Sequence, residues 1–124
     1  MWKKANANPA GKLVDDCVVR AISIATNQSW LKVYDDIYLT GRAEFDMPNS
    51  NEVWGLYLYR LGFEPFVLPN KCPRCVTIET FCRIFPIGTY IIGTGSHAVA
   101  IIDGDYYDTW DSGNQIASYF WRVI

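Results

Sequence analysis

Residues 89–110 read TYIIGTGSHAVAIIDGDYYDTW, and this stretch decides the expected fold. Apolar and β-branched residues dominate both sides of Asp103-Gly104, and an Asp-Gly pair between two such runs is a strong signal for a β-hairpin. An aromatic run near the end of the chain predicts one more strand. We therefore expect strands over residues 89–94, 97–102, 106–110 and 118–123.

The sequence before residue 89 has the periodicity of helices rather than strands. We expect irregular backbone over residues 1–14 and one short strand over 63–69. Helices are expected over residues 16–26, 30–39, 52–61 and 77–85. Helices first and a small antiparallel sheet last describe an α+β fold, formed by a single domain over residues 1–124.

Polar residues ahead of these helices are expected to cap them. Asp15 and Asp16 precede the first helix, where an acidic side chain can accept hydrogen bonds from free backbone N–H groups. Ser29 is the expected cap of the second helix. Asn49, followed three residues later by Glu52, resembles a capping box for the third helix.

The composition excludes several classes of protein. Half of the residues are apolar, which argues against disorder, and a net charge of −2 with no basic cluster argues against a nucleic-acid partner. No apolar run reaches the ~20 residues that a membrane span needs, and the first residues lack the apolar stretch of a signal peptide. Four cysteines are too sparse for a disulfide scaffold, so we expect free thiols and a cytoplasmic protein.

Cys17 and His97 are the residues that could carry chemistry. Cys17 lies at the start of the first predicted helix, where backbone N–H groups and the helix dipole favour a thiolate. His97 is the one histidine of the chain and begins a predicted strand. Because imidazole titrates close to neutral pH, it can serve as the base that activates a thiol.

A base of this kind needs an acceptor that fixes its tautomer, and two aspartates follow His97. With a two-residue turn at Asp103-Gly104, Val99 pairs with Asp108, which then shares the face of His97 as a diagonal neighbour. A three-residue loop would shift the register and present Asp111 instead. We favour Asp108.

The start DDCVVRAI and the segment SHAVAIIDGDYYDTWDSG resemble the papain-like cysteine protease superfamily, in particular small uncharacterised members from phages and bacteria. The resemblance covers most of the chain and implies that Cys17 is the nucleophile, His97 the base and Asp108 the orienting residue. Trp110 matches a tryptophan that covers the histidine in that family. The implied function is hydrolysis of peptide, isopeptide or amide bonds in a protein or peptide through a thioester, with no cofactor and no metal.

The chain departs from the family at the oxyanion hole, because Gly11 stands where a glutamine is usual. The backbone N–H of Cys17 and the side chain of Asn6 or Asn8 are the expected donors instead. The departure keeps open a catalytically inactive papain-like binding or inhibitor module. A deamidase or transglutaminase would use the same thioester. A small zinc-binding domain built on Cys72 and Cys75 is a third alternative, although CxxC supplies only two of four ligands.

Overall fold

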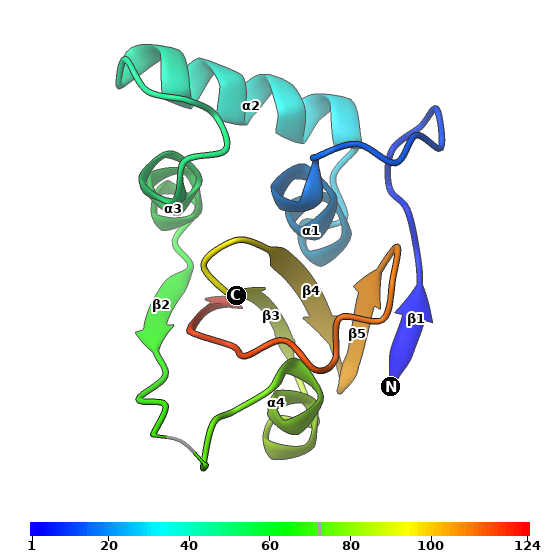
Figure 1. Cartoon of the computed structure of the whole chain (residues 1–124). Helices are drawn as coiled ribbons and strands as arrows, with labels where there is room; N and C mark the ends of the chain where they lie inside the picture. Colours follow the sequence, from blue (N-terminus) through cyan, green and yellow to red (C-terminus); the bar gives the residue numbers. More distant parts are fainter. Residues whose placement is uncertain (72) are drawn as a thin grey trace.

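The computed structural model describes residues 1–71 and 73–124, and its centre is a mixed β-sheet with helices on both faces (Figure 1). The strands lie side by side in the order β1-β5-β4-β3-β6-β2. Their bounds are β1 (Trp2–Lys4), β2 (Glu64–Val67), β3 (Thr89–Gly93), β4 (Ala98–Ile102), β5 (Asp105–Asp108) and β6 (Tyr119–Val123). The helices are α1 (Cys17–Thr26), α2 (Trp30–Ala43), α3 (Asn51–Arg60) and α4 (Ile78–Ile84).

The first strand corrects the expectation of irregular backbone and of a purely antiparallel sheet. β1 runs parallel to β5 at the sheet edge, with Trp2 opposite Tyr106 and Lys4 opposite Asp108. The Trp2 indole N–H also donates to the backbone oxygen of Asp108 at 3.2 Å. A three-residue edge strand with two lysines has no apolar alternation, so its pairing depends on the distant strand β5.

Each face of the sheet packs against helices because successive side chains of a strand point to opposite sides. Ile91 and Ala100 belong to the core that α1, α2 and α3 cover. Ile92 and Val99 belong to the core on the α4 side. The sheet is therefore buried on both faces, with α1 lying across β4 and α4 on the opposite side, as Figure 1 shows.

The hairpin between β4 and β5 has the predicted register. Ile102 pairs with Asp105 and Ala100 with Tyr107, so the turn is the two residues Asp103-Gly104. Both turn residues have positive φ, 49° and 80°, as a type I′ turn requires. This register fixes where β5 ends relative to the start of β4, and so where Asp108 lies relative to His97.

Helix boundaries follow the sequence prediction with two differences. Ser29 caps α2 as expected, accepting from the backbone N–H of Lys32 at 3.1 Å. The capping box at Asn49 is wrong, because Ser50 is the N-cap residue of α3 and makes no side-chain cap bond. α2 also continues through Gly41 to Ala43, where a loop was expected. A Cβ at Gly41 would lie 2.8 Å from the backbone oxygen of Asp46, so the close return of the chain requires this glycine inside the helix.

Two further expectations concern membranes and cysteines. Within residues 1–71 and 73–124, no helix has the length and apolar character needed to cross a bilayer. Cys17 and Cys82 are free thiols. Cys75 is disulfide-bonded, which corrects the expectation of a free thiol there. Cys72, the other candidate zinc ligand, lies outside the described residues.

Candidate active site

Three elements bring Cys17, His97 and Asp108 to one place. Cys17 is the first residue of α1, His97 immediately precedes β4, and Asp108 is the last residue of β5. The packing of α1 across β4 carries the helix start to the beginning of that strand. Asp108 is buried, while Cys17 and His97 are half-buried and line the same two surface cavities.

His97 contacts Asp108 through one ring nitrogen. Its Nε2 lies 2.6 Å from Oδ2 of Asp108, which leaves Nδ1 for the sulfur of Cys17. Burial acts to lower the pKa of His97, but hydrogen bonds with Asp108 and Cys17 outweigh it and raise the pKa to about 9. The imidazole is therefore cationic at neutral pH, between the Asp108 carboxylate and the sulfur of Cys17.

Every group that contacts the Asp108 side chain is a donor. Besides His97, the Ser112 hydroxyl donates to Oδ2 at 2.7 Å and the Thr109 backbone N–H donates to Oδ1 at 2.8 Å. A nitrogen of Arg20 lies 3.6 Å from Oδ1. Burial acts to raise the pKa of Asp108, but the bonds from His97 and Ser112 prevail and lower it. The site holds this carboxyl group ionised.

Asp111, the alternative orienting residue, lies elsewhere. It is exposed, and its Oδ1 accepts hydrogen bonds from the Tyr106 hydroxyl and the Gly113 backbone N–H. The two-residue turn is the reason, because it ends β5 with Asp108 facing His97. Trp110 packs its ring against His97 with centroids 5.1 Å apart, so the indole covers one side of the imidazole.

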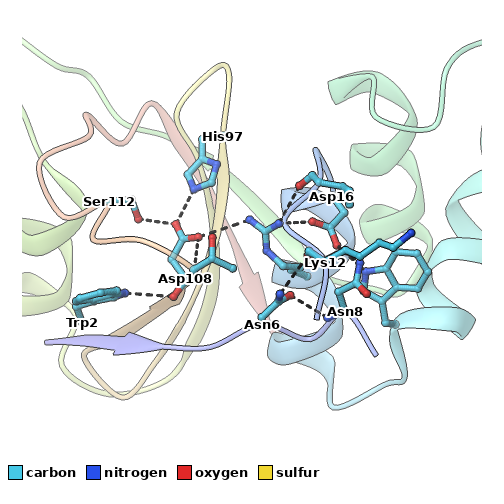
Figure 2. A network of polar contacts seen from close by, with 12 residues as sticks. Trp2, Asn6, Asn8, Lys12, Asp16, His97, Asp108 and Ser112 are labelled. Carbon is cyan, nitrogen blue, oxygen red and sulfur yellow. Dashed lines mark hydrogen bonds and ion pairs between the residues drawn. The ribbon is translucent and has the colours of Figure 1, made fainter. Parts of the chain in front are cut away.

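Asn6 and Asn8, the expected side-chain oxyanion donors, make hydrogen bonds within the N-terminal segment. The Asn6 amide donates to the Lys12 carbonyl, and the Asn8 amide donates to Asp16 (Figure 2). Their side-chain oxygens accept backbone N–H groups of the same segment. The first helical bond of α1 runs from the Arg20 N–H to the Asp16 oxygen. The backbone N–H groups of the helix start, including that of Cys17, precede this bond and have no partner within the helix.

A buried ionic network, of which the sequence predicts only the Asp16–Arg20 pair, lies beside Cys17 and Asp108 (Figure 2). Arg20 pairs with Asp16 one helical turn before it, a contact that the spacing predicts, and also reaches Asp108 on β5. Oδ2 of Asp16 accepts from the Trp30 indole at 2.9 Å and from Asn8 at 3.3 Å. Asp16 is the N-cap residue of α1. Its carboxylate faces Arg20, so it makes no hydrogen bond to the free backbone N–H groups of the helix. An arginine three residues after the cysteine is the one sequence signal for this network.

Two cavities meet at Cys17 and His97. The larger, about 560 Å³, extends along α2 and the segment between α2 and α3. The smaller, about 360 Å³, is lined by Leu13, Arg20 and Trp110. Because both cavities include the sulfur and the imidazole, a chain-like ligand can extend to either side of them. The described residues contain no group of three or more metal-ligating side chains.

The free energy of unfolding should fall as pH rises from 6.5 to 9, because the folded state holds the His97 proton more tightly than the unfolded chain does. Below pH 6.5 both states are protonated and the contribution is complete; above about 9 it is lost. A pKa change of this size corresponds to about 3 kcal/mol at most. Urea unfolding at a series of pH values measures the slope, and His97→Gln should flatten it. An equal slope in both proteins would contradict the assignment.

Comparison of the chain with protein-family models, with curated proteins and with solved structures finds no match.

Proposed function

We propose that the protein is a papain-like cysteine hydrolase that cleaves peptide, isopeptide or amide bonds. The observation that carries the proposal is the chain of contacts from Asp108 through His97 toward Cys17, with the sulfur at a helix start and an open cavity on either side. Each of these three residues has the neighbour that its role in such a hydrolase requires.

In the proposed reaction the sulfur of Cys17 attacks the substrate carbonyl and forms a thioester. Nδ1 of His97 holds the thiol proton and donates it to the departing amine. Asp108 keeps the Nε2 proton in place, so the ring retains the tautomer that points Nδ1 at the sulfur. Water then attacks the thioester with His97 as base, which releases the acyl group and restores the thiol.

The negative charge that develops on the carbonyl oxygen needs donors at the start of α1. The backbone N–H groups of Cys17 and Val18 precede the first helical hydrogen bond, and both residues line the larger cavity. The positive end of the helix dipole acts in the same direction. These groups supply the oxyanion hole in the proposal, without the side-chain amide that papain-like enzymes use.

An inactive papain-like binding module is the second candidate, and the hydrogen bonds made by Asn6 and Asn8 favour it. With Asn6 and Asn8 bonded inside their own segment, one expected donor is missing from the site. Loss of one oxyanion donor typically costs about 2.7–4 kcal/mol of transition-state stabilisation. The reactivity of the sulfur separates the two candidates.

Iodoacetamide should alkylate Cys17 at least about 100-fold faster than Cys82 at pH 7, because burial raises the pKa of Cys82 to about 11. His97→Ala should slow the alkylation of Cys17 by about 100-fold and leave Cys82 unchanged. Mass spectrometry of the modified peptides gives both rates. An activity-based probe for cysteine hydrolases should label the same residue. Alkylation of Cys17 that is insensitive to His97→Ala would remove the hydrolase and favour the binding module.

A further inference from the structure

The larger cavity has a wall of stacked aromatic rings on α2. Trp30, Tyr34 and Tyr38 recur every fourth residue and so lie in line along one face of the helix. The ring centroids are 5.1 Å apart for the first pair and 6.3 Å for the second, with interplanar angles of 19° and 10°. Tyr34 and Tyr38 remain 46% and 52% exposed. The stacked row forms a continuous apolar wall open to solvent.

One end of this aromatic wall (Trp30, Tyr34 and Tyr38) lies beside Cys17, the candidate nucleophile. The Trp30 indole donates to the carboxylate of Asp16, the residue immediately before Cys17. All three rings line the same cavity as Cys17 and His97. At 1.5 Å per residue, the wall extends about 12 Å along α2 away from the sulfur.

Other parts of the cavity offer apolar and backbone contacts. Met47 and Pro48 come from the segment between α2 and α3, and Gly95 and Ser96 come from the loop before His97. Gly95 and Ser96 are exposed, so their backbone groups are accessible to a ligand. An extended peptide binds well to such a surface, because its main chain pairs with backbone groups while its side chains fill apolar positions.

The wall, about 12 Å long, can contact two side chains that lie on the same side of an extended peptide. Side chains on the same side of an extended chain recur every two residues, which is about 6.4–6.8 Å. The rings recur at 5.1 and 6.3 Å. A peptide with large apolar side chains at alternate positions therefore directs each of them at the wall. Two adjacent apolar side chains point to opposite sides, and only one of them can reach it.

The charges of the cavity disfavour acidic ligands. Its charged lining residues are Asp15, Asp16 and His97. Arg20 pairs with Asp16, and Asp108 pairs with His97, so these charges are compensated. Asp15 is exposed, has no ion-pair partner among the described residues, and leaves a net negative charge beside Cys17.

We propose that the larger cavity binds an extended peptide with large apolar side chains at alternate positions and excludes peptides with acidic side chains there. The inference deepens the proposed function, because it names the substrate sequence on one side of the bond that Cys17 attacks. Occupation of the cavity does not itself require the reaction.

The test uses Cys17→Ala protein and two isomeric peptides, acetyl-Gly-Leu-Ser-Leu-Gly-amide and acetyl-Gly-Leu-Leu-Ser-Gly-amide. NMR titration of the indole N–H signals should show the alternating isomer binding at least about threefold more tightly. A peptide with glutamate in place of both leucines should bind more weakly than either. In the same background Tyr38→Ser should remove the advantage of the alternating isomer. Tyr59→Ser should preserve it, since Tyr59 is 67% exposed and lines neither cavity.

Equal affinity for the two isomers, or an equal loss in Tyr38→Ser and Tyr59→Ser, would overturn the proposed peptide site. The wild-type protein, mixed with a peptide library and analysed by mass spectrometry, separates this failure from failure of the hydrolase. Cleavage without an alternating apolar preference would leave the hydrolase and reject the peptide site. Preferential binding without cleavage or labelling of Cys17 would retain the peptide site in a binding module.

Discussion

Asp108→Asn should slow the reaction of Cys17 with a peptidyl acyloxymethyl ketone by about 10⁴-fold, the loss seen when the aspartate of a catalytic triad becomes asparagine. The reason lies in the four contacts of this side chain, all of which are with donors: His97, Ser112, Thr109 and Arg20. An amide has one accepting oxygen and one donating NH₂ group. It cannot accept at both positions.

Either orientation of the new amide disturbs the site. With its oxygen toward His97, its NH₂ group faces the Thr109 N–H and Arg20, and donors oppose donors. With its NH₂ group toward His97, Nε2 must become the acceptor, so the remaining proton moves to Nδ1. The ring is then held neutral, and the cationic imidazole that pairs with the Cys17 sulfur in the native site is lost. The donors around Asp108 therefore require a carboxylate at this position.

Asp111→Asn is the matched control, because it makes the same chemical change three residues away. Asp111 contacts Tyr106 and Gly113 and not His97, so the labelling rate should stay within about twofold of wild type. Rates of Cys17 labelling for both variants, together with their thermal unfolding, distinguish loss of chemistry from loss of fold. A slower Asp111→Asn and a normal Asp108→Asn would reverse the assignment of the orienting residue.

The sequence predicted those features of the fold that depend on local patterns. The helices, five of the six strands and the Asp103-Gly104 turn follow from periodicity and turn chemistry, which act over a few residues. Because the turn sets the register, the contact of His97 with Asp108 was also predictable. The parallel strand β1 was not, since its partner β5 lies about a hundred residues away and β1 itself has no pattern.

The candidate site was predictable to the same extent. Cys17, His97 and Asp108 could be selected from residue type, position and hairpin register, but the partners of the surrounding polar side chains could not. Asn6 and Asn8 had the right chemistry for an oxyanion hole, yet local turns and Asp16 use their amides. The reach of Arg20 to Asp108 depends on how α1 lies over the sheet, which no local pattern encodes.

Arg20→Met should lower the free energy of unfolding by about 3–5 kcal/mol. This is the largest stability effect that we expect from substitution of one buried residue. The Arg20 side chain is 8% exposed and contacts two buried carboxylates, Asp16 and Asp108, which are 7% and 1% exposed. Among the described residues, no buried side-chain nitrogen or oxygen lacks a hydrogen-bond partner. Methionine fills much of the same volume but leaves the buried Asp16 carboxylate without a cation and Asp108 with His97 alone.

Arg122→Met is the matched control, because Arg122 pairs with Glu64 at 2.9 Å on the exposed surface, and such a pair contributes about 1 kcal/mol or less. Urea unfolding at pH 7 gives both values. Asp16→Asn combined with Arg20→Met should restore part of the loss, since the unpaired buried charge of Asp16 disappears. Because Arg20 joins the helix that begins with Cys17 to the strand that ends with Asp108, the single variant should also slow Cys17 labelling. Equal destabilisation by the two arginine variants would mean that this buried network does not hold the helix and the strand together.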